Sequence, residues 1–220
     1  MLNMKIQIKI RLWKTNAKIW QKYNNNELLK LLLKFEELFD GTLGTWKTDP
    51  VHFKLKLDVK LICSRLYPVP KVHKEIFKKE VEILILLGLL ILANDSEWGA
   101  PYFAQPKPKS NWVRFISDFR NLNKQLKHKT YPMPNINEIL LKLECLQYVL
   151  LLDLNMGYYH ILLSKNSSNL CMIILPRVKY SYKCLPMGIS HSLEIFQHKM
   201  KDVFYWVWIY PWVHRWTFLY

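Results

Sequence analysis

Asp153 is the residue whose surroundings most strongly indicate chemistry. It ends an apolar run over 148–152 and is followed by the residues LNMG, in which Gly157 breaks the pattern. The run predicts a buried strand, and a carboxylate at the end of such a strand is costly unless it has a task. The structural alternative is a turn cap, because an Asp before a glycine-containing turn commonly binds the backbone of that turn.

Two cations form a second candidate group. Lys107 and Arg114 lie seven residues apart, on either side of a basic, proline-broken segment that predicts a hairpin tip between two short strands. Both side chains could point towards one triphosphate, the Arg through its planar fork and the Lys as a point charge. The alternative is that they are ordinary exposed charges of a hairpin.

The elements that would position these residues mix helices and strands without a regular strand–helix–strand alternation, which indicates an α+β protein. Apolar spacing, turn residues and caps predict helices over 27–39, 72–90, 135–143 and 192–204. Strands are predicted over 51–57, 101–105, 112–117, 148–153, 160–163, 171–175 and 179–185.

Composition limits the classes of function. The chain has 220 residues, is 50% hydrophobic and carries a formal charge of +15, which favours a polyanion such as nucleic acid or an anionic membrane, or simply a basic surface. Its four cysteines form no C-x-x-C pair and lie in or beside apolar runs, so we expect free, buried thiols, no disulfide partner, and neither a zinc nor a redox site. We find no secretion signal and expect an intracellular, cytoplasmic or nuclear protein.

The chain resembles the reverse transcriptases of retroelements, and of the gypsy-like long-terminal-repeat class in particular. Three stretches carry the resemblance in order: VRFISDFRNLNKQLKHKTYPMPNI, YVLLLDLNMGYYHI and LPMGISHSLEIFQHKM. LFDGTLGTW, YPVPKVHKEIFKKEVEILILLGLL and SEWGAPYFAQPK fit the segment that leads into that domain. The resemblance implies an RNA-directed DNA polymerase, with the α+β fingers and a partial palm of a right-hand polymerase whose palm sheet is incomplete.

The resemblance also divides the chain. We expect a basic N-terminal arm over 1–26, a helix plus extended linker over 27–70, reverse transcriptase fingers and partial palm over 71–202, and an aberrant Trp-rich tail over 203–220. The tail holds four of the nine Trp and no acidic residue, and two interpretations are open. It is either an edge that packs on further chain or, as we favour, a product of translation in the wrong frame.

Roles follow from the motifs residue by residue. The family holds two Mg²⁺ ions between palm carboxylates, and the resemblance gives Asp153 the catalytic role and makes Asp153 and the Leu154 carbonyl ligands of Mg²⁺. Nucleotide-binding roles fall on Lys107, Arg114, Tyr158 and Met187, with Tyr158 as the gate that excludes a 2′-hydroxyl. Template- or primer-binding roles fall on Pro186, Gly188 and Gln197. The implied partners are an RNA/DNA template–primer and a dNTP, and no membrane.

Supporting residues surround this set. Asp118 and Arg120 are expected to be structural, holding the fingers either through an internal ion pair or through a backbone contact. Trp98 and Phe103 either support the template path or pack in the core. Basic residues would contact phosphates without reading sequence, namely Lys107, Lys109, Lys124, Lys127 and Lys129.

The chain also departs from the family pattern. The family requires a Tyr-x-Asp-Asp motif after the helix that carries Gln197, and these residues hold none, so the second metal site is incomplete and we expect the chain to be inactive alone. His191 and Leu193 replace the usual small residue and Pro, and 84–92 is unusually apolar. One alternative is a non-catalytic nucleic-acid-binding remnant. Another is a basic membrane-associated protein, for which the Pro211-broken tail is poorly suited.

Overall fold

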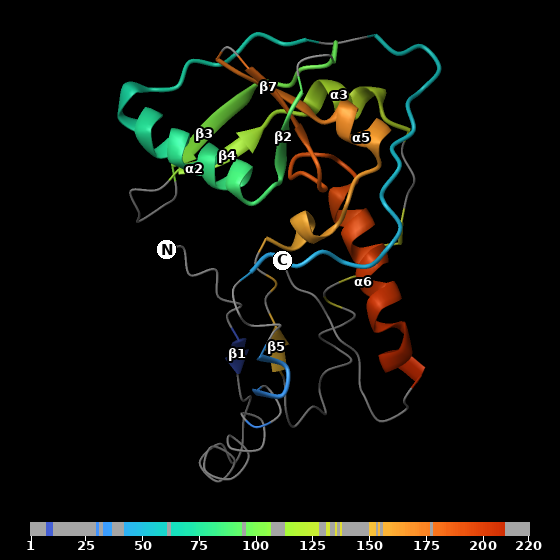
Figure 1. Ribbon diagram of the computed structural model, residues 1–220. Coiled ribbons are helices and arrows are strands. Elements are labelled where there is room, and N and C mark those ends of the chain that lie inside the picture. Colours follow the sequence, from blue (N-terminus) through green and yellow to red (C-terminus); the bar gives the residue numbers. More distant parts are fainter. Residues whose placement is uncertain are drawn as a thin grey trace. The chain divides into compact units, whose positions relative to one another are not determined.

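The protein is described by a computed structural model of residues 1–220, shown in Figure 1. The structure describes residues 8–10, 30, 33–36, 42–60, 63–93, 96–106, 113–127, 131–132, 135, 137, 150–152, 154, 156–176 and 178–209. The chain divides into two compact units. One comprises Met1–Gly44, Met133–Gly157 and Pro211–Tyr220, and the other Thr45–Pro132 and Tyr158–Tyr210.

The first unit contains a two-stranded antiparallel ladder. Strand β1 (Ile8–Ile10) pairs with β5 (Leu150–Leu152), so that Ile8 faces Leu152. β5 lies within the strand predicted over 148–153. β1 lies in the basic arm, where no strand was expected, although the sequence KIQIKI alternates Lys or Gln with Ile in the manner of a strand. The helices predicted over 27–39 and 135–143 fall mostly outside the described residues and stay predictions.

The second unit contains a three-stranded antiparallel sheet and a separate hairpin. The sheet has the order β2 (Leu90–Leu92), β7 (Val178–Tyr182), β6 (Met172–Leu175), and the hairpin pairs β3 (Tyr102–Pro106) with β4 (Val113–Ser117). A parallel bridge from Ala100 to Ile173 joins the start of β3 to β6. The strands predicted at 101–105, 112–117, 171–175 and 179–185 are confirmed within a few residues at their ends.

Helix α2 (Lys74–Leu86), preceded by the 3₁₀ turn η2 (Lys71–His73), packs on the hairpin. Phe77 stacks on Tyr102 with ring centroids 4.6 Å apart, and the buried residues of α2 recur at helical spacing. The predicted end of this helix near residue 90 is wrong. Gly88, at φ +68°, donates its N–H to the Ile85 carbonyl, and Leu89 donates to Leu84, which is a Schellman motif that ends the helix and sends the chain into β2.

This unit contains three further α-helices: α3 (Arg120–Gln125), α5 (Lys165–Leu170) and α6 (Ser192–Ile209). The 3₁₀ turn η3 (Gly157–His160) comes before α5 in the chain. α6 confirms the predicted helix from 192 and runs beyond 204. α5 was not predicted, although Ser164 caps it by accepting a hydrogen bond from the Ser167 N–H. The strand predicted at 160–163 is wrong at His160, which belongs to η3.

Two predicted strands are reduced to isolated bridges because each finds a partner at single positions only. Val51 bridges Leu163, Leu55 bridges Leu126, and Leu162 bridges Cys184. The segment 51–57 is therefore an extended strap that crosses the unit rather than a strand of a sheet.

The most deeply buried residues of the second unit come from β6, from α6 and from the segments that follow η3 and β7. Ile161, Met172, Ile173, Leu185 and Met200 are at most 1% exposed. Burial of this kind stabilises the fold by roughly 1.5–3 kcal/mol for each large apolar side chain.

The cysteines only partly follow the prediction of burial. Cys171 and Cys184 are buried, and burial raises the pKa of the Cys184 thiol to about 11. Cys63 is exposed, because its segment runs over the surface and only bridges Gly99, so the expected burial is wrong there. Cys145 lies outside the described residues.

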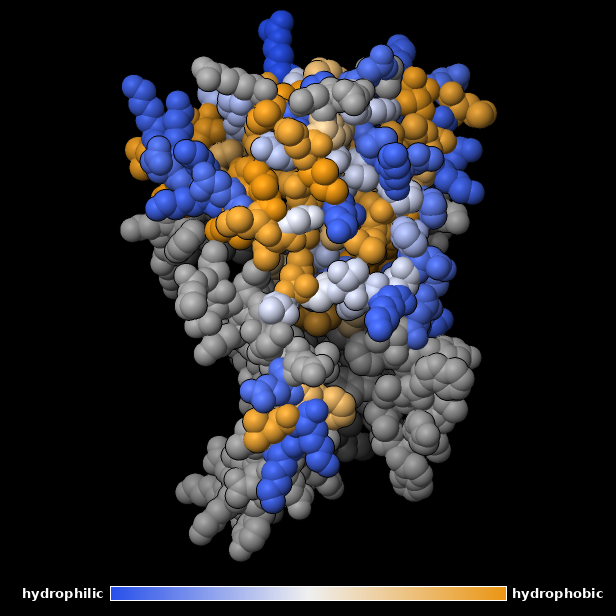
Figure 2. Space-filling view, viewed as in Figure 1, coloured by the Kyte–Doolittle hydropathy of each residue, from blue (hydrophilic) through white to orange (hydrophobic). Residues whose placement is uncertain are grey.

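The unusually apolar segment 84–92 has two sides. Leu84, Leu89 and Leu90 are buried, whereas Leu86, Ile91 and Leu92 are 85%, 46% and 58% exposed. Figure 2 shows apolar side chains over β2 in the middle of this face. No helix in the described part of the chain is long and apolar enough to cross a membrane.

Candidate nucleic-acid interface

A tight loop between β7 and α6 presents Met187 to solvent. Leu185 and Pro186 are fully buried, whereas Met187 is 53% exposed and Gly188 follows at φ +94°. The buried residues fix the stem of the loop, so Met187 stands out from a rigid base.

Two side chains distant in sequence hold the backbone of this loop. The Asn123 amide donates through Nδ2 to the Gly188 carbonyl (2.8 Å), and its Oδ1 accepts from the Ser190 N–H (2.9 Å). The Ser192 hydroxyl donates to the Pro186 carbonyl (2.8 Å) and is buried. The three bonds fix both sides of Met187 before any ligand arrives.

Gly188 has no room for a side chain. A Cβ placed on it would lie 2.8 Å from the Ser117 carbonyl oxygen, well inside van der Waals contact. The hydroxyls of Ser117 and Tyr182 lie 2.9 Å apart and share a buried hydrogen bond, which ties the end of β4 to β7. The loop therefore rests directly on the backbone of the hairpin.

Asp118, Arg120 and Tyr67 form a network beside this loop. Arg120 donates to Asp118 through Nε (2.9 Å) and Nη2 (2.6 Å), and the Tyr67 hydroxyl donates to Asp118 Oδ2 (2.9 Å). Arg120 Nη2 also donates to the Tyr67 hydroxyl (3.2 Å). The hydrogen bonds from Arg120, foremost among the causes, lower the pKa of the buried Asp118 carboxyl to about 2. The expected structural ion pair is confirmed.

An aromatic cluster surrounds Tyr158. Its ring meets Phe196 edge to face with centroids 5.2 Å apart, and Phe196 stacks on Trp46 at 5.6 Å. Phe196 is 2% exposed, and Tyr158 is half-buried, so burial raises the pKa of the Tyr158 phenol. The backbone N–H of Trp46 donates to the His160 carbonyl (2.9 Å), which holds the backbone that carries the indole.

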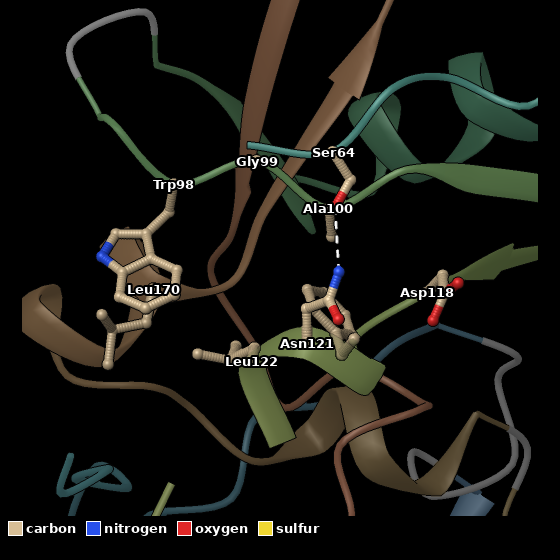
Figure 3. Close-up of a pocket in the computed structure, with 9 residues that line it drawn as sticks. Ser64, Trp98, Gly99, Ala100, Asp118, Asn121, Leu122 and Leu170 are labelled. Atoms are coloured by element: carbon tan, nitrogen blue, oxygen red, sulfur yellow. Dashed lines mark hydrogen bonds between the residues drawn. The ribbon is translucent and has the colours of Figure 1, made fainter. Parts of the chain in front are cut away.

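A small cavity lies behind the network (Figure 3). It measures about 10 Å³, roughly the room for one water, and is far too small for a nucleotide. Trp98 and Leu170 face each other on one side, and Asn121 Nδ2 donates to Ser64 Oγ (3.1 Å) on the other. Trp98 is 8% exposed, so it packs in the core rather than along a template path.

The known proteins that this chain resembles in sequence are polyproteins of transposons and viruses. No family model matches the chain. The Pol polyprotein of transposon 297 from Drosophila melanogaster is 29% identical over 175 residues, covering 78% of this chain and 15% of that protein. The gypsy Pol polyprotein of the same organism is 28% identical over 78% of this chain and 16% of its own length, and the putative enzymatic polyprotein of Cassava vein mosaic virus is 28% identical over 68% and 24%.

This chain is a homologue of retroelement Pol polyproteins. Its fold is that of reverse transcriptase: the foamy viral protease–reverse transcriptase bound to an RNA/DNA hybrid matches 89% of this chain and 26% of its own with a TM-score of 0.71 at 20% identity. The same enzyme bound to dsDNA gives a TM-score of 0.70 at 20% identity, over 88% of this chain and 39% of its own. The chain spans about a quarter or less of the Pol and enzymatic polyproteins named above.

Helix α6 brings several of the predicted reverse transcriptase site residues together. Ser192 at its start holds the loop with Pro186 and Met187, and Phe196 packs on Tyr158. Gln197, the next residue of α6, is half-buried. These predicted residues therefore lie on or around the first two turns of α6.

The remaining Pol site residues are placed only in part. Lys107 and Asp153 lie outside the described residues, as do Lys109 and Lys129. The backbone of Arg114 lies in β4, where it pairs with Gln105. Leu154 belongs to the first unit and is half-buried. Within the described ranges no group of three or more His, Cys, Asp or Glu could hold a metal ion.

Lys124, Lys127 and Phe103, of the supporting residues that the structure describes, lie at the surface. Lys124 and Lys127 are exposed at and after the end of α3. Phe103 is 38% exposed and meets the Tyr67 ring edge to face at 6.4 Å.

Sequence reasoning gave no role to Asn123, Ser192, Tyr67 or Trp46 in this Pol-like site. Ser192 was expected only as a helix cap, and its hydroxyl instead holds Pro186. Asn123 lies in the SDFRNLN motif and Tyr67 in YPVP, so both were within recognised stretches. Their partners lie 65 and 51 residues away, and no local pattern reports such contacts.

Acid should weaken the Asp118 network of this reverse transcriptase fold. Because the folded pKa of about 2 is below the ordinary value of 3.8, the carboxylate contributes stability that is present above pH 3.8 and lost as pH falls towards 2. We expect the free energy of unfolding of the wild type to exceed that of Asp118→Asn by about 2 kcal/mol more at pH 5 than at pH 2, measured by urea denaturation. Asp58→Asn, at an exposed site, is the control, and a difference that does not vary with pH would contradict the prediction.

Proposed function

We propose that this chain binds a nucleic-acid template–primer on the side that carries Met187, as the fingers and partial palm of a reverse transcriptase. The observation that carries the proposal is the loop itself. Asn123 and Ser192 fix its backbone, and Met187 stands 53% exposed at its tip. A side chain held in this way can support a base pair without losing further conformational freedom on binding. The fold and the Pol homologues support the same proposal, and the foamy viral enzyme has been solved with dsDNA and with an RNA/DNA hybrid.

Each residue of the site would have a separate task. Gly188 lets the nucleic acid or the loop approach β4 closely, because it has no Cβ. Arg120 uses Nε and Nη2 within its network and is 78% exposed, so its Nη1 would donate to a phosphate. Gln197 would contact the template strand, and Tyr158 would pack beneath the sugar of an incoming nucleotide.

The catalytic part of the proposal depends on residues outside the described ranges. Asp153 and the Leu154 carbonyl would hold Mg²⁺, which in this fold supplies charge neutralisation for nucleotidyl transfer, and Lys107 with Arg114 would bind the dNTP. No Asp-Asp pair occurs in these 220 residues, so we propose that they do not extend a primer on their own.

Binding and extension can be measured with the same chain. With a fluorescent RNA template annealed to a recessed DNA primer, we expect binding that weakens steeply as salt rises, and no extension when Mg²⁺ and dNTPs are added. Arg120→Gln should weaken binding about 3- to 10-fold and reduce the salt slope by about 1, whereas Lys79→Gln on α2 should change neither. Absent or salt-insensitive binding would refute the proposal.

The alternative is a nucleic-acid-binding protein with no catalytic use, which the absence of an Asp-Asp pair favours. Robust Mg²⁺-dependent extension by these 220 residues, abolished by Asp153→Asn, would exclude this alternative and show that the second carboxylate pair is not required.

A further inference from the structure

Two segments far apart in sequence meet beside the end of α3 in an arrangement that the proposed site does not use. Leu55 of the strap bridges Leu126 in antiparallel sense, the Lys56 N–H donates to the Gln125 carbonyl (2.9 Å), and the Lys127 N–H donates to the Lys54 carbonyl (2.7 Å). In Figure 1 the strap passes alongside the region of α3 and α5.

This pairing decides which way the side chains face. Residues directly opposite each other in an antiparallel pair lie on the same face, and faces alternate along each segment. Leu126 is 2% exposed and lies on the inner face with Leu55. Lys54 and Lys127 are therefore opposite each other on the outer face, and both are exposed.

With Lys56 and Lys124, these two residues form a group that we call the lysine ladder, consisting of Lys54, Lys56, Lys124 and Lys127. Lys56 shares the face of Lys54, two residues away, and its Nζ donates to the Lys124 carbonyl (2.7 Å), which sets it against the end of α3. All four lysines are exposed. In Figure 2, hydrophilic side chains gather along the side of the molecule where Figure 1 shows the strap, α3 and α5.

The ladder places like charges together without an ionic partner. Like charges directly opposite each other in an antiparallel pair destabilise that pair. The ion pairs found among the described residues are Lys78–Glu82 and Asp118–Arg120, and neither involves the ladder. Because the opposed lysines destabilise the free protein, an anion that neutralises them would stabilise it. The gain would be largest for an anion with several charges whose spacing matches that of the lysines.

We propose that the lysine ladder binds the sugar–phosphate backbone of a nucleic-acid duplex as a second contact, outside the loop and the Arg120 network. This rests on the proposed function and extends it along α3, which has Arg120 at one end and the ladder at the other. The sequences KLK and KQLK contain no aromatic residue on which an unpaired base could stack, so the contact is to phosphates alone. An anionic membrane fits less well, because Leu57 is a single exposed leucine beside the ladder and stable membrane attachment needs a larger apolar contribution.

The test compares two fourfold variants of equal charge. The ladder variant is Lys54→Gln, Lys56→Gln, Lys124→Gln and Lys127→Gln. The control variant is Lys71→Gln, Lys74→Gln, Lys78→Gln and Lys79→Gln, on η2 and α2. For a fluorescent blunt duplex of 20 base pairs, we expect the ladder variant to lower the slope of log K against log salt by about 3.6 and to bind at least about 10-fold more weakly in 0.1 M salt. The control variant should keep a slope close to that of the wild type.

The double variant Lys54→Gln, Lys127→Gln guards against misfolding, because it removes the opposed charges and leaves Leu55 and Leu126 unchanged. It should unfold at the same or a higher urea concentration than the wild type and lower the salt slope by about 2. A wild-type slope in the ladder and double variants, or equal losses in the ladder and control variants, would overturn the inference while leaving the proposed function standing.

Two further outcomes separate the explanations. If the wild type fails to bind any duplex or template–primer, both the proposed function and the ladder contact are wrong. If the ladder variant keeps full affinity for the duplex but loses binding to vesicles with 30% phosphatidylserine, the ladder is a membrane contact and the inference is overturned.

Discussion

Gly188→Ala should lower the free energy of unfolding by about 2–5 kcal/mol and weaken template–primer binding at least about 10-fold. Part of the cost is the backbone, because φ is +94° and a side chain in the left-handed region costs about 1–2 kcal/mol. The rest is steric, since the new Cβ would lie 2.8 Å from the Ser117 carbonyl, and such overpacking typically costs about 1–3 kcal/mol. Urea denaturation and fluorescence anisotropy measure the two effects.

Gly88→Ala provides a matched control in the same chain. Gly88 also has a positive φ, +68°, but a Cβ there would meet nothing within 4 Å. It should therefore show only the backbone cost of about 1–2 kcal/mol and bind nucleic acid normally. Equal free energies of unfolding for the two variants would show that the loop does not contact β4 tightly. Normal template–primer binding by Gly188→Ala would show that the loop does not contact the nucleic acid.

Phe196→Ala should have the largest effect on stability, a loss of about 3–5 kcal/mol. The ring is 2% exposed and lies between Trp46 and Tyr158, so its removal leaves a cavity lined by both. Small domains are stable by only about 5–15 kcal/mol, so about a fifth or more of the total would be lost. The midpoint and slope of a urea transition measure this loss.

Leu193→Ala, on the same helix, is the control because Leu193 is 38% exposed. Its cost should stay below about 1 kcal/mol, as is usual for surface substitutions. If Phe196→Ala lowers the free energy of unfolding no more than Leu193→Ala does, then the aromatic cluster does not hold α6 against Tyr158. The placing of Gln197 near Tyr158 would then lose its support.

The elements that sequence predicted well are those with a local cause. The strands of the β3–β4 hairpin flank a proline-rich tip, and α6 follows from apolar spacing after Ser192.

The wrong predictions concern where a helix ends and whether a strand finds partners. The helix before β2 was predicted to continue through Gly88, because 84–92 is apolar throughout and a buried helix cannot be told from a buried strand by hydrophobicity alone. The strap at 51–57 alternates like a strand but finds only isolated partners.

The candidate site shows the same division. Met187 and Gly188 were found through a motif, because the loop residues are adjacent in sequence. Asn123 and Tyr67 were not given their roles, because hydrogen bonds to residues more than 50 positions away leave no periodic trace. The opposition of Lys54 and Lys127 likewise depends on a register that only the folded backbone sets.

The strap has a consequence for how the chain is made. In the strap, the Phe53 N–H donates to Ser167 Oγ, 114 residues later in the chain. Just before the strap, the Asp49 carbonyl accepts from Nζ of Lys199, 150 residues later. At a synthesis rate of about 5–20 residues per second, this part of the chain would wait roughly 8–30 s on the ribosome before its last partner is made. During that interval its backbone groups and the lysines of the ladder are open to other partners. The nascent chain is therefore most exposed to binding the polyanionic RNA around it before the unit can close.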